Sequence, residues 1–222
     1  MTKIKAAIFD LDGTIVDSMY VWDKVDDDFL TNRGIPVTQK YKDDIKTMFF
    51  ETAAKYTIDT YNLSESVEQV VEIWLNMARY EYEFNVKAKP NIIEYFEFLK
   101  KHGVKIGIAT SSNPYLTEPV LKNNNMDKYI DEICYTSQVG KSKKFPDIYL
   151  YTAKKLKTAP NECIVFEDIA EGICGAKKAG MKTIAVYDKS SEADMEILKK
   201  TADKYIFNFS EMSEESIWNV TE

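Results

Sequence analysis

The chain begins with a short apolar run that ends in two acidic residues and a glycine, "IKAAIFDLDGT" at residues 4–14. An apolar run without polar alternation is typical of a strand that is buried on both faces of a parallel sheet. Asp10 and Asp12 follow this run one residue apart, with no basic residue next to them. Because like charges repel at this spacing and carboxylates are costly to desolvate, we expect a cation at this strand end.

Further apolar runs recur along the chain, and helical patterns separate them. The runs are "VKIGIA" at 104–109, "EICY" at 132–135, "CIVF" at 163–166, "TIAVY" at 183–187 and "KYIF" at 204–207. The intervening segments carry apolar residues at helical spacing, and two of them end in Gly103 and Gly180. This alternation of strands and helices predicts an α/β fold with a doubly wound parallel sheet.

Residues 17–87 interrupt this alternation, because they show one helical pattern after another and no convincing strand. In the first pattern Met19, Trp22, Val25 and Phe29 share one side of the helix. We therefore predict that residues 17–87 form an inserted, all-helical cap domain. Residues 1–16 and 88–222 would then form the catalytic α/β core.

Composition narrows the class of protein. The 222 residues are 45% hydrophobic, which is enough for a real core, and the formal net charge is -7 at pH 7. This charge argues against a broad nucleic-acid surface. No apolar stretch approaches the roughly 20 residues of a transmembrane helix, and Asp10 interrupts any signal-type segment. We expect a cytoplasmic monomer that binds a small molecule, and neither nucleic acid nor a membrane.

Polar residues gather where the predicted strands end. Ligands of open α/β sheets bind outside the carboxyl ends of the strands, so we expect these residues to converge on one crevice. Hard oxygen ligands suit Mg²⁺, which would supply the missing cation. One aspartate could then attack a phosphorus atom, and the other could protonate the leaving oxygen and activate water. The candidate residues at these strand ends are Asp10, Asp12, Gly13, Thr14, Thr110, Ser111, Ser112, Asn113, Lys141, Lys143, Lys144, Glu167 and Asp168.

Four segments, "DLDGT", "ATSSN", "KSKKFPD" and "FEDIAEGICGAKKAGM", stand in this order, with the helical insertion after the first. The arrangement resembles the haloacid dehalogenase superfamily, in its phosphatase and β-phosphoglucomutase-like branch with a helical cap. The resemblance implies a Rossmann-like core and Mg²⁺ as cofactor. It also implies hydrolysis of a small phosphorylated metabolite, a phosphomonoester, through an aspartyl-phosphate intermediate.

Carried over onto this chain, the resemblance makes Asp10 the nucleophile and Asp12 the general acid and base. Thr110 and the backbone N–H of Ser111 would bind the phosphoryl group. The implied metal ligands are Asp10, Asp12 through its backbone carbonyl, Glu167 and Asp168.

The resemblance also assigns a phosphate-binding lysine. Lys143 matches it, because it lies four residues before Asp147 as in the family's K-P-x-P-D pattern. Lys144 replaces the first proline of that pattern, so the choice of Lys143 over Lys141 depends on spacing alone.

A β-phosphoglucomutase-like sugar phosphomutase is the alternative function. That group has a histidine five residues after the acid that matches Asp17, and a cap arginine that holds a second phosphate. Trp22 occupies the histidine position here, and no arginine stands between Arg33 and Arg79. These departures favour hydrolysis over phosphoryl transfer between positions of a sugar. The intact acidic residues disfavour a catalytically inactive binding or regulatory protein.

Overall fold

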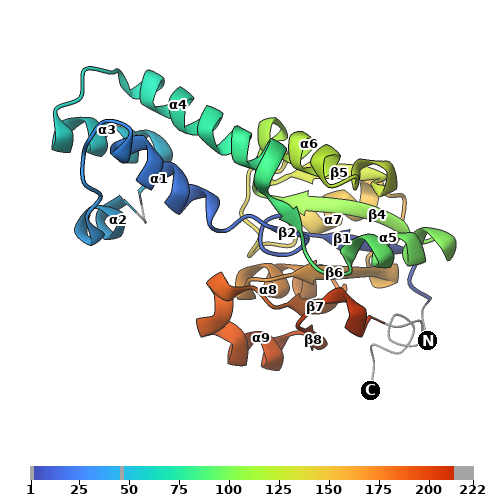
Figure 1. Cartoon of the computed structure of the whole chain (residues 1–222). Helices are drawn as coiled ribbons and strands as arrows, with labels where there is room; N and C mark the ends of the chain where they lie inside the picture. The colour runs from blue at the N-terminus through green and yellow to red at the C-terminus, as the bar shows by residue number, and fades with distance from the viewer. Residues whose placement is uncertain (1–2, 46–47, 213–222) are drawn as a thin grey trace. The chain divides into compact units, whose positions relative to one another are not determined.

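The structure, a computed structural model, describes residues 3–45 and 48–212. Within it the chain divides into two compact units. One unit comprises the chain up to Ser18 and from Val86 onward, and the other comprises Met19–Asn85. The first unit has an α/β architecture, whereas the second is helical (Figure 1).

A six-stranded parallel sheet forms the centre of the first unit, in the order β5-β4-β1-β6-β7-β8 (Figure 1). The strands are β1 (Ala6–Phe9), β4 (Lys105–Thr110), β5 (Glu132–Tyr135), β6 (Cys163–Glu167), β7 (Lys182–Val186) and β8 (Lys204–Ile206). The chain winds from β1 to β4 and β5 on one side, and then crosses to β6, β7 and β8 on the other. This order confirms the predicted doubly wound fold. It also creates a switch point between β1 and β6, where such sheets bind ligands.

The first strand is buried on both faces, since all four residues of β1 have no exposed surface. Ala6 and Ile8 belong to one apolar cluster, which also contains Ile148. Phe9 points to the opposite face and stacks on Phe166, with 4.5 Å between the ring centroids. Successive side chains therefore enter two separate apolar layers, which explains why this run shows no polar alternation.

Helices cover both faces of this sheet. They are α5 (Ile92–Lys101), α6 (Pro114–Asn123), α7 (Asp147–Lys155), α8 (Ala170–Lys178) and α9 (Met195–Thr201), with the short 3₁₀ helices η2 (Asp127–Tyr129), η3 (Thr136–Gln138), η4 (Pro160–Glu162), η5 (Lys189–Asp194) and η6 (Phe209–Glu211). Helices α7 and α8 pack on the face of Ile8, and Phe96 of α5 contacts Phe9 on the other. Within the described residues no helix combines the length and the apolar character needed to cross a membrane.

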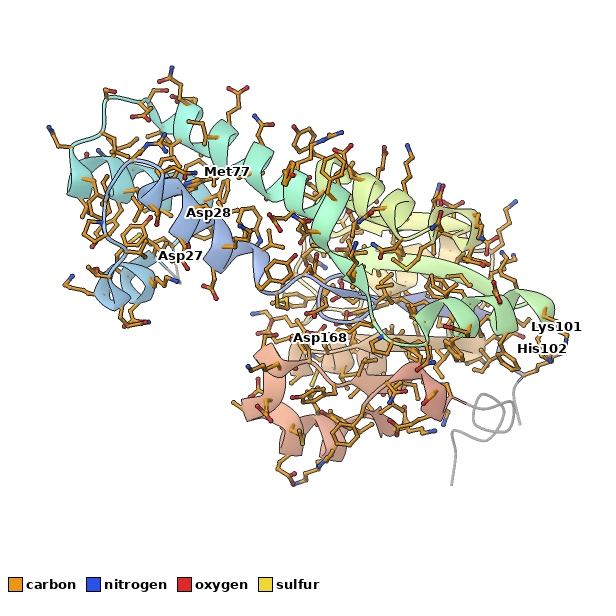
Figure 2. The ribbon with its side chains drawn as sticks, viewed as in Figure 1. Asp27, Asp28, Met77, Lys101, His102 and Asp168 are labelled. Atoms are coloured by element: carbon orange, nitrogen blue, oxygen red, sulfur yellow. The ribbon has the colours of Figure 1, made fainter. Side chains whose placement is uncertain are left out.

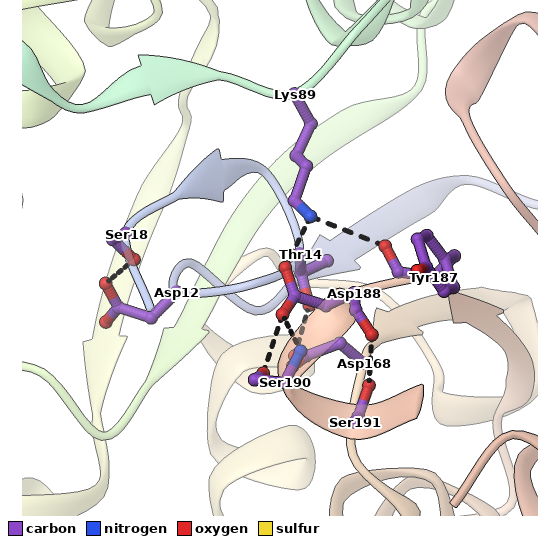
Figure 3. Close-up of polar contacts among 9 residues, drawn as sticks. All are labelled: Asp12, Thr14, Ser18, Lys89, Asp168, Tyr187, Asp188, Ser190 and Ser191. Atoms are coloured by element: carbon purple, nitrogen blue, oxygen red, sulfur yellow. Dashed lines mark hydrogen bonds and ion pairs between the residues drawn. The ribbon is translucent and has the colours of Figure 1, made fainter. Parts of the chain in front are cut away.

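A two-stranded antiparallel ribbon stands where the chain leaves the first unit and returns to it. Its strands are β2 (Val16–Asp17) and β3 (Lys87–Ala88). The expectation of no strand within residues 17–87 was therefore wrong at both ends, because strands of two residues are too short to show a periodicity. Just beyond β3, the Lys89 ammonium donates to Asp188 Oδ2 at 2.5 Å (Figure 3). The Lys89 N–H donates to the Ile15 carbonyl at 2.9 Å, so the returning chain is anchored to the core.

The second unit is a small helical bundle with an aromatic core. Its helices are α1 (Val21–Thr31), α2 (Gln39–Ile45), α3 (Phe50–Tyr61) and α4 (Val67–Tyr80), followed by the π-helical turn η1 (Glu81–Asn85). Phe29 and Phe50 meet Trp74 of α4 edge-on, with ring centroids at 5.6 and 5.4 Å. Ser66 is the N-cap of helix α4, and its side chain forms a capping box with Gln69. That this unit acts as a cap stays a prediction.

Asp26 is a half-buried carboxylate on α1 without a hydrogen-bond or ion-pair partner among the described residues. Its neighbour Asp27 (Figure 2) pairs instead with Lys42, at 2.7 Å. Burial and, to a smaller extent, the charge of Asp23 raise the pKa of Asp26 to about 7, and Lys42 offsets only part of this rise. Keeping Asp26 ionised therefore costs free energy in the folded protein.

Asp26→Asn should therefore stabilise the protein above pH 7. The unfolded carboxyl group ionises near its ordinary pKa of 3.8, so the cost is fully present above about pH 7 and disappears below about pH 4. We expect the free energy of unfolding to rise by at least about 1 kcal/mol at pH 8 and to match wild type near pH 4. Urea unfolding, followed by tryptophan fluorescence at pH 8 and near pH 4, measures the free energy of unfolding at each pH. Exposed Asp59→Asn on α3 is the control, and a gain confined to low pH would contradict this account.

Candidate active site

Three carboxylates meet where β1 and β6 end. Asp10 directly follows β1, Glu167 is the last residue of β6, and Asp168 comes next. The two strands are neighbours with Phe9 beside Phe166, and the Asp10 N–H donates to the Phe166 carbonyl at 2.9 Å. One oxygen from each of the three carboxylates lies within 4.8 Å of the others, and all three side chains are buried.

A buried lysine joins these acids. Lys143 comes from the loop between β5 and α7, is 5% exposed, and forms an ion pair with Asp10. Its ammonium also donates to Glu167 Oε1 at 2.8 Å. Burial alone would lower the pKa of Lys143, but the charges of Asp10 and Glu167 outweigh it and raise the pKa above its ordinary value. Lys141, in contrast, is exposed and pairs with Asp147 at 2.7 Å. Lys143 is therefore the lysine that reaches the acidic group.

Glu167 is held by two donors on one oxygen and by none on the other. Tyr149 of α7 and Lys143 both donate to Oε1 at 2.8 Å. Oε2 is buried and has no hydrogen-bond partner among the described residues. Burial raises the pKa of Glu167 to about 7, because the attraction of Lys143 offsets only part of the desolvation. Burial and the Glu167 carboxylate also raise the pKa of Tyr149 well above its ordinary value, so its hydroxyl remains a donor.

Asp168 is positioned by the turn that follows β1. The Thr14 hydroxyl donates to Asp168 Oδ1 at 2.8 Å (Figure 3). Gly13 has a positive φ of 80°, and a Cβ there would lie 2.5 Å from Asp168 Oδ2. The turn therefore requires glycine for its backbone angle and for the close approach of this carboxylate. Burial, followed by the charge of Asp10, raises the pKa of Asp168 well above its ordinary value.

Helix α8 approaches the acidic group through residues without a side chain. A Cβ on Gly172 would collide with the Glu167 carboxylate, and a Cβ on Gly175 would collide with the backbone carbonyl of Lys143. Neither glycine has a positive φ, so space rather than backbone angle requires them. The two glycines let one helix support both Glu167 and the loop that carries Lys143.

The acidic group fits a divalent cation. Three carboxylates face one ammonium group, which leaves two negative charges unbalanced if all are ionised. Oxygen ligands of this kind suit Mg²⁺, and the unpaired Oε2 of Glu167 is a buried acceptor that such an ion would satisfy. Asp10, Glu167 and Asp168 are the side chains that could hold it.

Three of the predicted site residues lie outside this group. Asp12 is half-buried, and its carboxylate accepts a hydrogen bond from Ser18 at 2.7 Å (Figure 3). Thr110 ends β4, the strand next to β1, and its Oγ1 accepts the Ser112 N–H at 2.9 Å. Ser111 follows and is exposed. These residues share the carboxyl edge of the sheet with Asp10.

Sequence reasoning did not find Tyr149, or the roles of Thr14, Gly172 and Gly175. Tyr149 lies on the apolar face of its helix, and its ring does belong to the core. For the two glycines the sequence offers one signal. Gly172 and Gly175 stand three residues apart inside a predicted helix, where glycine lowers helix stability and therefore needs a reason.

Comparisons with known proteins show similarity over most of the chain. A family model described as "Haloacid dehalogenase-like hydrolase" matches residues 7–186. The chain is 27% identical over 195 residues to hexitol phosphatase B of Escherichia coli. The matched region covers 86% of this chain and 87% of that protein. It is 25% identical over 181 residues to a phosphorylated carbohydrates phosphatase of Thermotoga maritima, and this match covers 82% of this chain and 84% of that protein. The solved structure of a β-phosphoglucomutase from Clostridium difficile shares the fold, with a TM-score of 0.71 and 23% sequence identity. This superposition covers 98% of this chain and 96% of that chain.

Tyr149→Phe should weaken Mg²⁺ binding by about 10- to 100-fold, the usual effect of losing a hydrogen bond to a metal ligand. The variant removes the hydroxyl that donates to Glu167 and keeps the buried ring. Isothermal titration calorimetry with MgCl₂ measures the affinity. Tyr151→Phe, half-buried on the same helix, is the matched control and should bind Mg²⁺ like wild type. Equal affinities in the two variants would show that Tyr149 does not position Glu167.

Proposed function

Because the chain belongs to the haloacid dehalogenase-like hydrolase family, we propose that it is a Mg²⁺-dependent phosphatase that hydrolyses a small phosphorylated metabolite. The observation that carries this proposal is the buried group of Asp10, Lys143, Glu167 and Asp168 at the switch point of the sheet. It combines a nucleophile, a cation and metal-binding oxygens within one small volume.

Asp10 is the proposed nucleophile. A carboxylate oxygen of Asp10 attacks the phosphorus atom, a new P–O bond forms, and the ester P–O bond breaks. The product is an aspartyl-phosphate, and the electron pair of the broken bond leaves with the alcohol oxygen. The Lys143 ammonium, which pairs with Asp10 in the structure, stabilises negative charge on the non-bridging phosphoryl oxygens.

Asp12 is the proposed general acid and base. It donates a proton to the leaving alcohol oxygen, and the resulting carboxylate then takes a proton from water. That water attacks the phosphorus atom and breaks the bond to Asp10, which releases phosphate and restores the nucleophile. The hydrogen bond from Ser18 supports this role, since it holds the carboxylate in one orientation.

Thr110 and Ser111 are the proposed remaining phosphoryl ligands. Both follow β4, beside the strand that carries Asp10. The Thr110 hydroxyl is fixed, since its oxygen accepts the Ser112 N–H. A bound Mg²⁺ ion, held by Asp10, Glu167, Asp168 and the Asp12 carbonyl, would neutralise phosphoryl charge and so make attack by a carboxylate easier.

A phosphorylated sugar or polyol is the substrate class that the named relatives favour, since two of them are a hexitol phosphatase and a phosphorylated carbohydrates phosphatase. We propose that residues 19–85 act as a cap that excludes bulk water during turnover, because this unit is inserted directly after the segment that carries both aspartates. We further propose that the enzyme acts as a cytoplasmic monomer.

Asp10→Asn should abolish phosphate release. Wild-type protein is assayed against sugar phosphates, nucleotides, phosphoglycolate and an aryl phosphate, with MgCl₂ and with EDTA. We expect Mg²⁺-dependent release that falls more than about a thousandfold in the variant, because the covalent step is lost. Metal-independent release, or turnover that survives in Asp10→Asn, would refute the mechanism. Transfer of phosphate within a sugar phosphate without net release would instead establish a phosphomutase.

Lys143→Ala should lower kcat/KM by about 100-fold or more, since it removes the buried charge that faces the phosphoryl oxygens. Lys141→Ala is the matched control from the same loop, and its activity should stay at the wild-type level because Lys141 pairs with Asp147 on the surface. Circular dichroism and thermal unfolding establish that both variants are folded. Equal activities of the two folded variants would remove Lys143 from the proposed site.

A further inference from the structure

A buried ion pair lies where the chain returns to the first unit. The Lys89 ammonium donates to Asp188 Oδ2 at 2.5 Å and to the Tyr187 carbonyl at 3.4 Å (Figure 3). The side chains of Lys89 and Asp188 are 14% and 4% exposed. Burial would raise the pKa of Asp188, but the hydrogen bonds from Lys89 and Ser190 outweigh it and lower that pKa. The carboxylate of Asp188 is therefore ionised at neutral pH, and Lys89 is the cation that pairs with it.

Asp188 is itself fixed at the carboxyl end of β7. The residue before it, Tyr187, donates its N–H to the Ile206 carbonyl at 2.8 Å. Oδ1 of Asp188 accepts the N–H and the hydroxyl of Ser190 at 2.8 and 2.6 Å (Figure 3). The Ser191 hydroxyl donates to the Asp188 carbonyl at 3.2 Å. The oxygen that receives Lys89 therefore has a fixed position on the central sheet.

The backbone of Lys89 holds the turn that follows β1. Its N–H donates to the Ile15 carbonyl at 2.9 Å. Inside the turn, the N–H groups of Ile15 and Val16 donate to the Leu11 carbonyl at 3.0 and 3.2 Å. Asp12, the proposed general acid and base, lies within this set of hydrogen bonds, so the position of its carboxylate depends on them.

The ribbon of β2 and β3 is too small to hold this turn by itself. Its register consists of two pairs, Val16 with Ala88 and Asp17 with Lys87. A two-stranded pair is marginal in water even when it is longer. The Lys89–Asp188 ion pair directly follows the ribbon and ties it to β7, and because the pair is largely buried, salt screens it little.

We propose that the Lys89–Asp188 ion pair positions Asp12 for proton transfer. Lys89 is a positioning residue, because it acts on Asp12 through the Ile15 carbonyl and the turn. A misplacement of about 1 Å at a reacting group can cost about 100-fold in rate. The proposal rests on the proposed hydrolysis for the function of Asp12, and it goes beyond that hydrolysis by assigning a function to Lys89 and Asp188.

Hydrogen–deuterium exchange on the full chain tests the structural part without any need for activity. In Lys89→Met, the backbone N–H groups of residues 11–18 should exchange at least about tenfold faster than in wild type, because the turn opens locally more often. Exchange in β6 should stay at the wild-type rate. Lys177→Met is the matched control and should exchange like wild type in residues 11–18. It breaks an ion pair with Asp203 at 2.9 Å, at the opposite end of β7.

Kinetics with two phosphomonoesters test the catalytic part. Benzyl phosphate releases a basic alkoxide that needs a proton, whereas p-nitrophenyl phosphate releases a stable anion that needs none. In Lys89→Met, kcat/KM should fall at least about tenfold for benzyl phosphate and stay within about twofold for p-nitrophenyl phosphate, because only the first ester depends on a positioned acid. A general loss of structure would lower both values equally. Lys177→Met should match wild type with both esters.

Thermal unfolding establishes that each variant is folded. If Lys89→Met does not fold, because it leaves the Asp188 carboxylate buried and unpaired, the double variant Lys89→Met/Asp188→Asn removes both charges and should show the same selective losses. Wild-type exchange in residues 11–18 of the folded variant, or equal losses with both esters, would overturn the proposal. If wild type hydrolyses neither ester, the proposed hydrolysis fails with these substrates, and the exchange rates alone decide whether Lys89 holds the turn of Asp12.

Discussion

Repulsion among three buried carboxylates is the constraint on which the architecture of the first unit depends. Asp10, Glu167 and Asp168 place oxygens within 4.8 Å of one another, away from water. Lys143 offsets one of these charges, yet the pKa values of Glu167 and Asp168 stay raised. Such a group keeps its geometry only if the surrounding backbone is rigid, because each carboxylate would otherwise turn toward solvent.

The fold supplies that rigidity from segments far apart in the sequence. β1 and β6 lie side by side at the centre of the sheet, so their ends cannot move independently. Tyr149 fixes one oxygen of Glu167, and Thr14 fixes one oxygen of Asp168. Gly172 and Gly175 allow α8 to press against this assembly without a side chain between them. The acidic group is thus held by packing and hydrogen bonds together, which is how a preorganised site differs from a surface cluster of acids.

The sheet and the positions of the acids could be predicted because both follow from local pattern. A fully apolar run such as residues 4–9 indicates a buried strand, and a polar residue directly after it must lie at the strand end. Tyr149 could not be predicted, since helical spacing indicates only that its ring is buried and says nothing of its hydroxyl. The spacing of Gly172 and Gly175 marks an unusual helix, but it does not reveal that the missing side chain at Gly172 makes room for the Glu167 carboxylate. The ribbon strands at Val16–Asp17 and Lys87–Ala88 are too short to produce any pattern.

The helical unit also contains a half-buried carboxylate, Asp26, but its surroundings differ from those of the acids at the sheet edge. At the sheet edge, Lys143 reaches Asp10 and Glu167 directly. In the helical unit no described residue pairs with Asp26, and Lys42 is bound to Asp27 instead. A neutral side chain at position 26 would fold at lower cost at neutral pH, so folding alone gives no reason for a carboxylate there. The same electrostatic reasoning calls for a metal ion at the sheet edge, where Lys143 balances only one of three buried carboxylates.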